Sequence, residues 1–293
     1  MMIQTNNYPE IYGPGESDKL VEQRTHEILQ MTPEAPTGEL LKKLFSFIDL
    51  TTLNTDDNAE TARKFCRNLN AFKDNFTDIP SVAAICIYPT LLETVKESLK
   101  DQDVNIAVVG AGFPSSQTFL PVKIAECELL VSKGANEIDI VISVGQFLAG
   151  EYQQVFEEIS SIKNTIGDVH LKIILETGLL KTAENIRLAS LIAMEAGADF
   201  IKTSTGKLSP AATPEAVYSM AIAIRDFHTV TNRIIGLKPA GGISNVNDAA
   251  RYYTLIDHIL GEKWTRPEFF RLGASRLSNS ILSAISDKDI SFF

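Results

Sequence analysis

The sequence has few of the residues that build disulfide frameworks or metal sites. It contains 3 cysteines and 4 histidines in 293 residues. The cysteines (Cys66, Cys86 and Cys127) are scattered without metal-ligand spacing, and the histidines match no zinc motif. We therefore expect no metal site. The same cysteine pattern is typical of a protein kept in a reducing, cytoplasmic compartment.

Long uncharged stretches and an excess of positive charge are also missing. The longest uncharged stretch, Val104–Val122, contains two prolines and several glycines, so we expect no membrane-spanning helix. The first residues lack a basic segment followed by an apolar one, which argues against a secretory signal. A net charge of −10 argues against a nucleic-acid or membrane-surface partner. A local basic pocket could still bind a small phosphate.

Two common enzyme motifs are incomplete or missing. Gly110 and Gly112 follow an apolar run as in a dinucleotide fingerprint, but the third glycine is replaced by Ser115. Pro114 also stands where the helix of that motif would begin. There is no G-x-S-x-G elbow, so serine hydrolase chemistry has no support.

What the chain does contain is a regular alternation of short apolar runs and longer stretches with helical spacing. Runs rich in Ile, Val or Phe are typical of parallel strands buried on both faces. Eight evenly spaced units predict an α/β fold, the (β/α)8 TIM barrel, with a doubly wound open sheet as the alternative. The runs are LFSFIDL (44–50), SVAAICIY (81–88), VNIAVVG (104–110), EIDIVIS (137–143), HLKIILET (170–177), DFIKTS (199–204), RIIGLKPA (233–240) and FFRLGAS (269–275).

Helix boundaries and a domain division follow from the same reading. Ser or Thr precedes three helical stretches and glycine follows three, as expected for helix caps. Residues 1–38 are predicted to be an N-terminal extension, with one helix over 15–31 and a linker over 32–38. Residues 39–293 are predicted to form the barrel. The expected capping residues are Thr182, Thr213 and Ser244, and the expected helix ends are Gly134, Gly197 and Gly261.

Strand alternation directs four charged side chains into one interior. In EIDIVIS, Ile138, Ile140 and Ile142 form the face covered by helices, which leaves Asp139 pointing inward. The same alternation directs inward the three charges of the other strands, namely Asp49, Lys202 and Lys238. A single lysine at a strand end is more often a solvated or ion-paired group than a functional one. Four inward charges on four strands make that interpretation harder to sustain, because burying charge is costly.

A pair of neighbouring lysines has a specific chemistry. Two ammonium groups about 5 Å apart at an effective dielectric of about 20 repel by roughly 3 kcal/mol, or about 2 pKa units. One lysine would then be partly neutral near pH 7 and could attack a carbonyl to form a Schiff base. Asp139, with a lysine and a water, could move the protons. This chemistry needs no cofactor.

Two glycine-bearing loops are placed where barrels often bind phosphate. Gly241 and Gly242 follow the seventh run, and Gly273 to Ser275 follow the eighth, at the start of the last helix. Each alone could be an ordinary turn. Finding both in the loops after strands 7 and 8 favours a phosphate site.

Six segments together resemble the deoxyribose-phosphate aldolase family of class I aldolases on (β/α)8 barrels. They occur in order from Phe47 to Ser275: FIDLTTL, AICIYP, EIDIVI, DFIKTSTGK, GLKPAGGI and FRLGAS. The resemblance implies reversible cleavage of 2-deoxy-D-ribose 5-phosphate to acetaldehyde and D-glyceraldehyde 3-phosphate. The implied partner is a small phosphorylated sugar, and a homo-oligomer is possible.

The resemblance also implies roles for individual residues. Lys202 would form the Schiff base, Lys238 would lower the pKa of Lys202, and Asp139 would relay protons. Asp49 and Thr203 would orient substrate or water, and Cys86 would lie near the substrate. The phosphate would be held by Gly206, Lys207, Gly241, Gly242 and Ser275.

The chain departs from the family pattern in two places. Arg276 replaces a Ser or Thr after GAS and could contact phosphate or point outward. The chain ends in Phe293, whereas some members end in a tyrosine that helps protonate the enamine, so another donor is needed. The alternatives that stay open are a Schiff-base aldolase with another donor or acceptor, and a catalytically silent barrel that binds or scaffolds.

Overall fold

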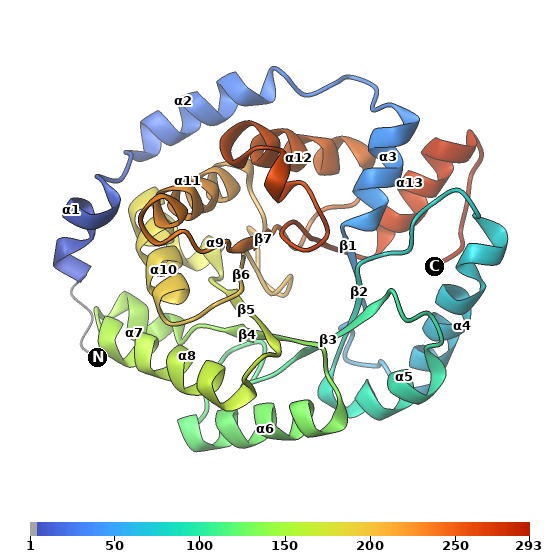
Figure 1. Cartoon of the computed structure of the whole chain (residues 1–293), viewed down its shortest axis with the longest axis horizontal. Helices are drawn as coiled ribbons and strands as arrows, with labels where there is room; N and C mark the ends of the chain where they lie inside the picture. Colours follow the sequence, from blue (N-terminus) through green and yellow to red (C-terminus); the bar gives the residue numbers. More distant parts are fainter. Residues whose placement is uncertain (1–4) are drawn as a thin grey trace.

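The computed structural model describes residues 5–293, in which eight parallel strands form a nearly closed barrel surrounded by helices (Figure 1). Strands β1 to β7 pair with one another in sequence order, and β8 pairs with β1. The predicted (β/α)8 barrel is therefore confirmed. The strands are β1 (Ile48–Thr51), β2 (Ala84–Ile87), β3 (Asn105–Val109), β4 (Glu137–Val141), β5 (His170–Ile174), β6 (Phe200–Lys202), β7 (Gly236–Lys238) and β8 (Leu272–Ala274).

The seam between β7 and β8 decides between a barrel and an open sheet. Two isolated parallel bridges cross it, Leu237 with Phe270 and Ala240 with Gly273. The main-chain N–H of Arg271 donates to the carbonyl of Leu237 at 3.1 Å, which adds a ladder contact. These bonds join the two edges of the sheet, so the open-sheet alternative does not apply.

The helices cover the outside of the barrel, and six of the thirteen α-helices among residues 5–293 begin at a side-chain cap. Thr182 and Thr213 cap α10 and α11 as predicted, while Asn245 rather than Ser244 caps α12 by accepting from the N–H of Asp248. The helices are α1 (Tyr8–Tyr12), α2 (Asp18–Leu29), α3 (Gly38–Ser46), α4 (Ala59–Asn75), α5 (Leu92–Ser98), α6 (Leu120–Lys133), α7 (Val144–Leu148), α8 (Tyr152–Ile166), α9 (Thr177–Leu180), α10 (Ala183–Glu195), α11 (Pro214–Thr231), α12 (Val246–Leu260) and α13 (Arg276–Ser286).

The first predicted strand was only partly right. Residues 44–46 end helix α3, and the strand begins at Ile48. Leu41, Leu44 and Phe45 recur at helical spacing and are buried, so the amphipathic pattern extends the helix into the apolar run. Helix α3 packs against α12 and α13. It starts at residue 38, so the predicted domain boundary between residues 38 and 39 falls inside its first turn.

The N-terminal extension is fastened to the outside of the barrel. The helix predicted over 15–31 is α2, and among the described residues it is preceded by an additional short helix, α1, which carries Tyr8 and Tyr12. Both tyrosine hydroxyls donate to Glu195 at the end of α10, at 2.7 and 2.6 Å. Asp18 of α2 accepts from the N–H of Ala183 at 2.6 Å and so helps to cap α10. The division into 1–38 and 39–293 stays a prediction, and its first four residues lie outside the described residues.

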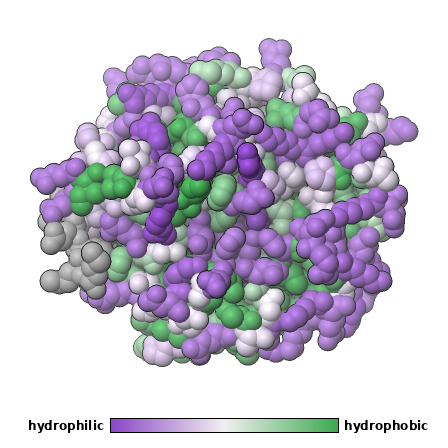
Figure 2. Space-filling view, in the orientation of Figure 1, coloured by the Kyte–Doolittle hydropathy of each residue, from purple (hydrophilic) through white to green (hydrophobic). Residues whose placement is uncertain are grey.

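The face drawn in Figure 2 is mostly hydrophilic, with apolar side chains in small separate groups. Among residues 5–293, no helix combines the length and apolar character needed to cross a membrane.

We predict that Gly236→Ala destabilises the barrel. A Cβ on Gly236 would lie 2.3 Å from the ring of Phe200, its buried partner on β6. Overpacking of this kind costs about 1–3 kcal/mol, so the urea midpoint measured by circular dichroism should fall. Gly38→Ala is the matched control, because a Cβ there meets nothing within 4 Å. Equal midpoints for the two variants would contradict the prediction.

Candidate active site

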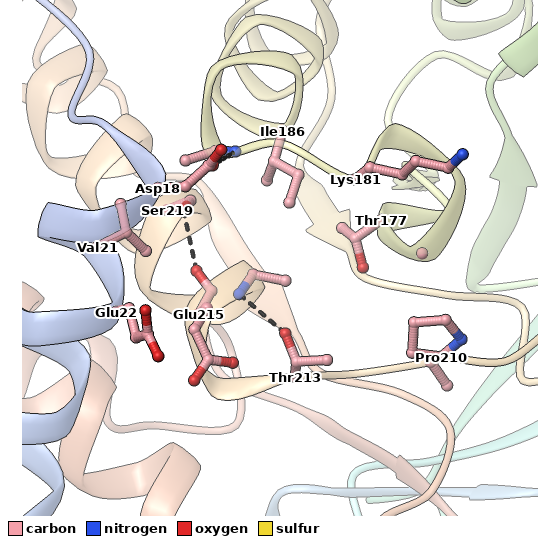
Figure 3. A pocket seen from close by; sticks show the side chains of 14 residues that line it. Asp18, Val21, Glu22, Thr177, Lys181, Ile186, Pro210, Thr213, Glu215 and Ser219 are labelled. Atoms are coloured by element: carbon pink, nitrogen blue, oxygen red, sulfur yellow. Dashed lines mark hydrogen bonds between the residues drawn. The ribbon is translucent and has the colours of Figure 1, made fainter.

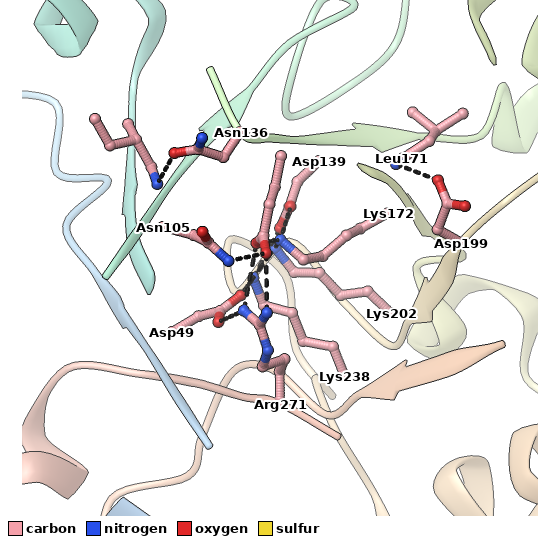
Figure 4. Close-up of polar contacts among 12 residues, drawn as sticks. Asp49, Asn105, Asn136, Asp139, Leu171, Lys172, Asp199, Lys202, Lys238 and Arg271 are labelled. Atoms are coloured by element: carbon pink, nitrogen blue, oxygen red, sulfur yellow. Dashed lines mark hydrogen bonds and ion pairs between the residues drawn. The ribbon is translucent and has the colours of Figure 1, made fainter. Parts of the chain in front are cut away.

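Seven charged side chains converge inside the barrel (Figure 4). They comprise three carboxylates and four cations, and each is at most 3% exposed. Burial of so many charges is tolerable only because each is paired with charges of opposite sign. The residues are Asp49 on β1, Glu137 and Asp139 on β4, Lys172 on β5, Lys202 on β6, Lys238 on β7 and Arg271 just before β8.

The carboxylate of Asp139 lies at the centre of this cluster. Its Oδ2 accepts from Lys202 Nζ at 2.8 Å and from Lys238 Nζ at 2.8 Å. Its Oδ1 accepts from Lys172 Nζ at 3.1 Å. The two lysines that the sequence analysis paired therefore share one oxygen atom, and the third lysine holds the other.

A second carboxylate, Asp49, distinguishes the two paired lysines. It forms an ion pair with Lys238 at 2.5 Å and one with Arg271 at 2.7 Å. Among residues 5–293, Lys202 forms an ion pair only with Asp139. Glu137 lies below them and pairs with Arg271 at 2.9 Å and with Lys172. Lys238 is thus held by two carboxylates and Lys202 by one.

The unequal number of carboxylate partners contributes to opposite pKa shifts of Lys202 and Lys238. Burial lowers the pKa of Lys202, Asp139 opposes the change, and the Lys238 ammonium lowers the pKa further. Burial also disfavours the charged form of Lys238, but Asp139 and Asp49 outweigh it and raise its pKa well above the usual value. Lys202 is therefore the lysine that most readily becomes neutral. The sequence analysis ascribed the lowering to Lys238, whereas burial is the larger cause.

A cavity of about 210 Å³ opens above this cluster and is lined by Lys202. The predicted phosphate residues also line it, so the structure brings them together with the lysine. The cavity is bounded by loops after β6, β7 and β8, and its lining includes Gly206, Lys207, Gly241, Gly242, Ser275 and Arg276. Arg276 is exposed and faces this cavity rather than lying away from it.

Glycine allows these loops to approach one another closely. Gly206, Gly241 and Gly242 have φ values of 78°, 84° and 82°, which glycine adopts without strain. A Cβ on Gly241 would lie 2.7 Å from the Cβ of Ala211 and 3.1 Å from the Cα of Gly206. Helix α13 begins at the cavity and has no side-chain cap, so its first N–H groups are available to an anion.

Three other predicted residues lie near the cluster in different settings. Cys86 is buried on β2, and burial raises the pKa of its thiol. The hydroxyl of Thr203 donates to the carbonyl of Ala240 at 3.2 Å and accepts from its N–H at 2.9 Å. The Lys207 ammonium donates to the carbonyl of Leu53 across the cavity. Their roles toward a substrate stay predictions.

The C-terminal tail does not line the cavity. The N–H groups of Phe292 and Phe293 donate to Asn279 of α13 at 2.9 and 3.0 Å. The ring of Phe293 lies 5.9 Å from that of Phe72 on α4, so the tail packs between outer helices (Figure 1). In this arrangement the tail provides no group that could transfer a proton in the cavity.

The sequence analysis missed Lys172, Glu137 and Arg271. The alternation rule would have found them: Lys172 lies between Leu171 and Ile173, and Glu137 is two residues before Asp139. These three side chains lie deeper in the barrel than the carboxyl ends of the strands. Lys172 pairs with Asp49 and Asp139, and Arg271 pairs with Asp49. Glu137 in turn pairs with both of these cations.

A larger cavity of about 560 Å³ lies outside the barrel, between α2 and the ends of α10 and α11 (Figure 3). It contains none of the predicted site residues. Its charged lining is mostly acidic (Asp18, Glu22 and Glu215, with Lys181), which does not suit a phosphate. Among residues 5–293, no group of three or more His, Cys, Asp or Glu is arranged to hold a metal ion.

Comparison with known proteins gives a consistent result. The model of the DeoC/LacD family of aldolases matches residues 44–254. The deoxyribose-phosphate aldolase of Homo sapiens is 41% identical over 255 residues, covering 82% of this chain and 79% of that protein. The Bos taurus enzyme of the same name is 40% identical over 251 residues, covering 81% and 78%.

A solved structure supports the fold. The tetrameric deoxyribose phosphate aldolase of Aeropyrum pernix superposes with a TM-score of 0.67 at 23% identity, covering 88% of this chain and 97% of that chain.

We predict that Lys238→Met moves imine formation to higher pH. The reaction of Lys202 with a small aldehyde requires the neutral amine, so its rate rises as pH rises through the Lys202 pKa. Burial still lowers the pKa of Lys202 in this variant, but loss of the Lys238 ammonium removes the second lowering cause, so the pKa of Lys202 rises. At pH 7 the rate should fall roughly 10- to 100-fold.

The measurement is adduct formation with cyanoborohydride from pH 5 to pH 10, quantified by mass spectrometry. Lys133→Met is the control, since Lys133 pairs with Glu93 on the outside of the barrel. An unchanged pH profile in Lys238→Met would show that the neighbouring ammonium has no effect on Lys202.

Proposed function

The chain belongs to the DeoC/LacD family of aldolases, and from that premise we propose that it reversibly cleaves 2-deoxy-D-ribose 5-phosphate to acetaldehyde and D-glyceraldehyde 3-phosphate. The observation that carries the proposal is Lys202: a buried lysine of lowered pKa, bonded to Asp139 and lining the cavity. Its neighbour Lys238 stays charged, as Schiff-base chemistry requires.

The proposed reaction starts when neutral Lys202 Nζ attacks the C1 aldehyde of the open-chain sugar. Asp139 takes up and returns protons as the carbinolamine loses water to give the iminium ion. The C3 hydroxyl then gives its proton to Asp139 and becomes the aldehyde of the leaving product. The electron pair of the breaking C2–C3 bond forms the C1=C2 bond of the enamine, and the π electrons of the iminium move to its nitrogen. D-Glyceraldehyde 3-phosphate leaves, and the two-carbon enamine stays bound to Lys202.

Protonation of the enamine at C2 and hydrolysis of the resulting iminium ion release acetaldehyde and free Lys202. The C-terminal phenylalanines carry no proton to give. We therefore assign this step to a water held by the Asp139–Lys238 pair, whose ammonium is positioned by two carboxylates. Asp49 acts in this scheme by holding Lys238.

The phosphate is assigned to the cavity loops. Lys207 and Arg276 supply positive charge, while Gly206, Gly241, Gly242 and Ser275 present main-chain groups beside the uncapped start of α13. The cavity opens from Lys202 toward these loops, so one molecule can place its aldehyde at the lysine and its phosphate at the glycines.

Two broader assignments belong to the same proposal. A cytoplasmic location is supported by three buried cysteines, none of them in a disulfide among the described residues. A homo-oligomer is also proposed for this chain, and the Aeropyrum pernix structure is described as a tetramer.

The decisive experiment is covalent trapping. Incubation with acetaldehyde and borohydride should add a single ethyl group to Lys202, and Lys202→Leu should abolish both this adduct and cleavage of 2-deoxy-D-ribose 5-phosphate. If no adduct formed at all, the protein would be a catalytically inactive barrel with a binding or scaffolding role. An adduct formed only with a larger ketone would identify an aldolase with another donor.

We predict that Lys207→Met weakens binding of phosphorylated substrate. Loss of a charge-assisted contact should raise KM for 2-deoxy-D-ribose 5-phosphate roughly 10- to 100-fold and leave the kinetics with unphosphorylated 2-deoxyribose unchanged. Lys181→Met, which removes an exposed lysine from the larger cavity, is the matched control. A similar loss with both substrates would place Lys207 outside the phosphate site.

A further inference from the structure

Glu176 is a buried carboxylate that the reaction scheme does not use. It is the second residue after the end of β5 and is 2% exposed. It forms no ion pair with any of residues 5–293. Its backbone has φ 55° and ψ 57°, in the left-handed region that residues other than glycine seldom occupy. A buried carboxylate without a cation, held in an unfavourable conformation, is expected where it has a function.

Within the described part of the chain, the hydrogen bonds that its carboxylate accepts all come from one residue of the phosphate loop. The hydroxyl of Thr205 donates to Glu176 Oε2 at 2.6 Å, and the N–H of Thr205 lies 3.3 and 3.4 Å from the two carboxylate oxygens. Thr205 Oγ1 in turn accepts from the N–H of Lys207 at 3.1 Å. The Glu176 carboxylate thereby orients residues 205–207 of the loop.

The backbone around Glu176 supports the same loop from below. The N–H of Leu175 donates to the carbonyl of Lys202, and the N–H of Thr177 donates to that of Thr203, both at 2.9 Å. A Cβ on Gly178 would lie 2.2 Å from the carbonyl oxygen of Pro210, so α9 packs directly on the far end of the loop. Residues 175–178 thus form a platform under residues 202–210.

We propose that Glu176 is a positioning residue for phosphate recognition. By accepting hydrogen bonds from Thr205, it fixes the positions of the Gly206 main chain and the Lys207 side chain. This assignment rests on the proposed function. A carboxylate facing the phosphate itself would repel it. Glu176 is absent from the cavity lining, while Thr205, Gly206 and Lys207 are present, so it acts through the loop. The charge strengthens its hydrogen bond to the hydroxyl.

The test compares Glu176→Ala with Glu176→Gln and with Thr205→Val. Binding of inorganic phosphate is measured by calorimetry, and kinetics are measured with 2-deoxy-D-ribose 5-phosphate and with unphosphorylated 2-deoxyribose. Glu176→Ala should weaken phosphate binding and raise KM for the phosphorylated sugar about tenfold or more, with kcat little changed. The kinetics with the unphosphorylated sugar should be unchanged. Glu176→Gln keeps an acceptor oxygen and should show a smaller effect.

A double-mutant cycle isolates the contact. If Glu176 acts through Thr205, the double variant Glu176→Ala/Thr205→Val should lose no more phosphate affinity than either single variant. Glu184→Ala is the control for loss of a nearby carboxylate, since Glu184 is exposed on α10. Additive losses would show that the two residues act independently and would overturn the proposal.

Equal losses with both sugars, or unchanged phosphate affinity, would also overturn it by showing a purely structural role. Circular dichroism checks folding, and Glu176→Gln with Thr205→Val decides the question if Glu176→Ala does not fold. Failure of the aldolase proposal would be seen separately, as absence of the Lys202 adduct in the wild-type protein. Phosphate binding reports on the loop in either case.

Discussion

The structure of the site depends on one buried carboxylate that is shared by three lysines. Asp139 contacts Lys172, Lys202 and Lys238 inside the barrel, where a buried charge without a partner is costly. Loss of this carboxylate would leave several ammonium groups buried next to one another. Glu137 and Asp49 add two negative charges and Arg271 adds one positive charge, so the cluster is neutral when Lys202 is uncharged.

The chemistry arises from an asymmetry within this cluster. Lys202 and Lys238 are equally close to Asp139, yet only Lys238 has a second carboxylate, and their pKa values move in opposite directions. The lysine with less compensation is also the one that lines the cavity. The placement of Asp49 beside Lys238 alone thus contributes to the different pKa values of two lysines that share Asp139.

Lys207, the second lysine of the segment that contains Lys202, has a different environment. It lies five residues after Lys202 but in an exposed loop, where glycine conformations and the Glu176–Thr205 hydrogen bond determine the backbone. Strand β6 places Lys202, for which we propose the reaction with the aldehyde, and the following loop places Lys207, for which we propose the contact with phosphate. A stretch of six residues thereby spans both ends of the proposed substrate.

The sequence by itself determined the alternation of strands and helices, and strand parity was enough to direct Asp49, Asp139, Lys202 and Lys238 to one interior. Successive side chains of a strand point to opposite faces, so this alternation follows from the sequence of each strand without any tertiary information. It could not show that residues 44–46 extend a helix, since an apolar run fits either element. Closure across β7 and β8, the unequal pairing of the two lysines and the contact of Glu176 with Thr205 were decided only by the tertiary structure. These features join residues from different strands, and their distances depend on how the whole barrel closes.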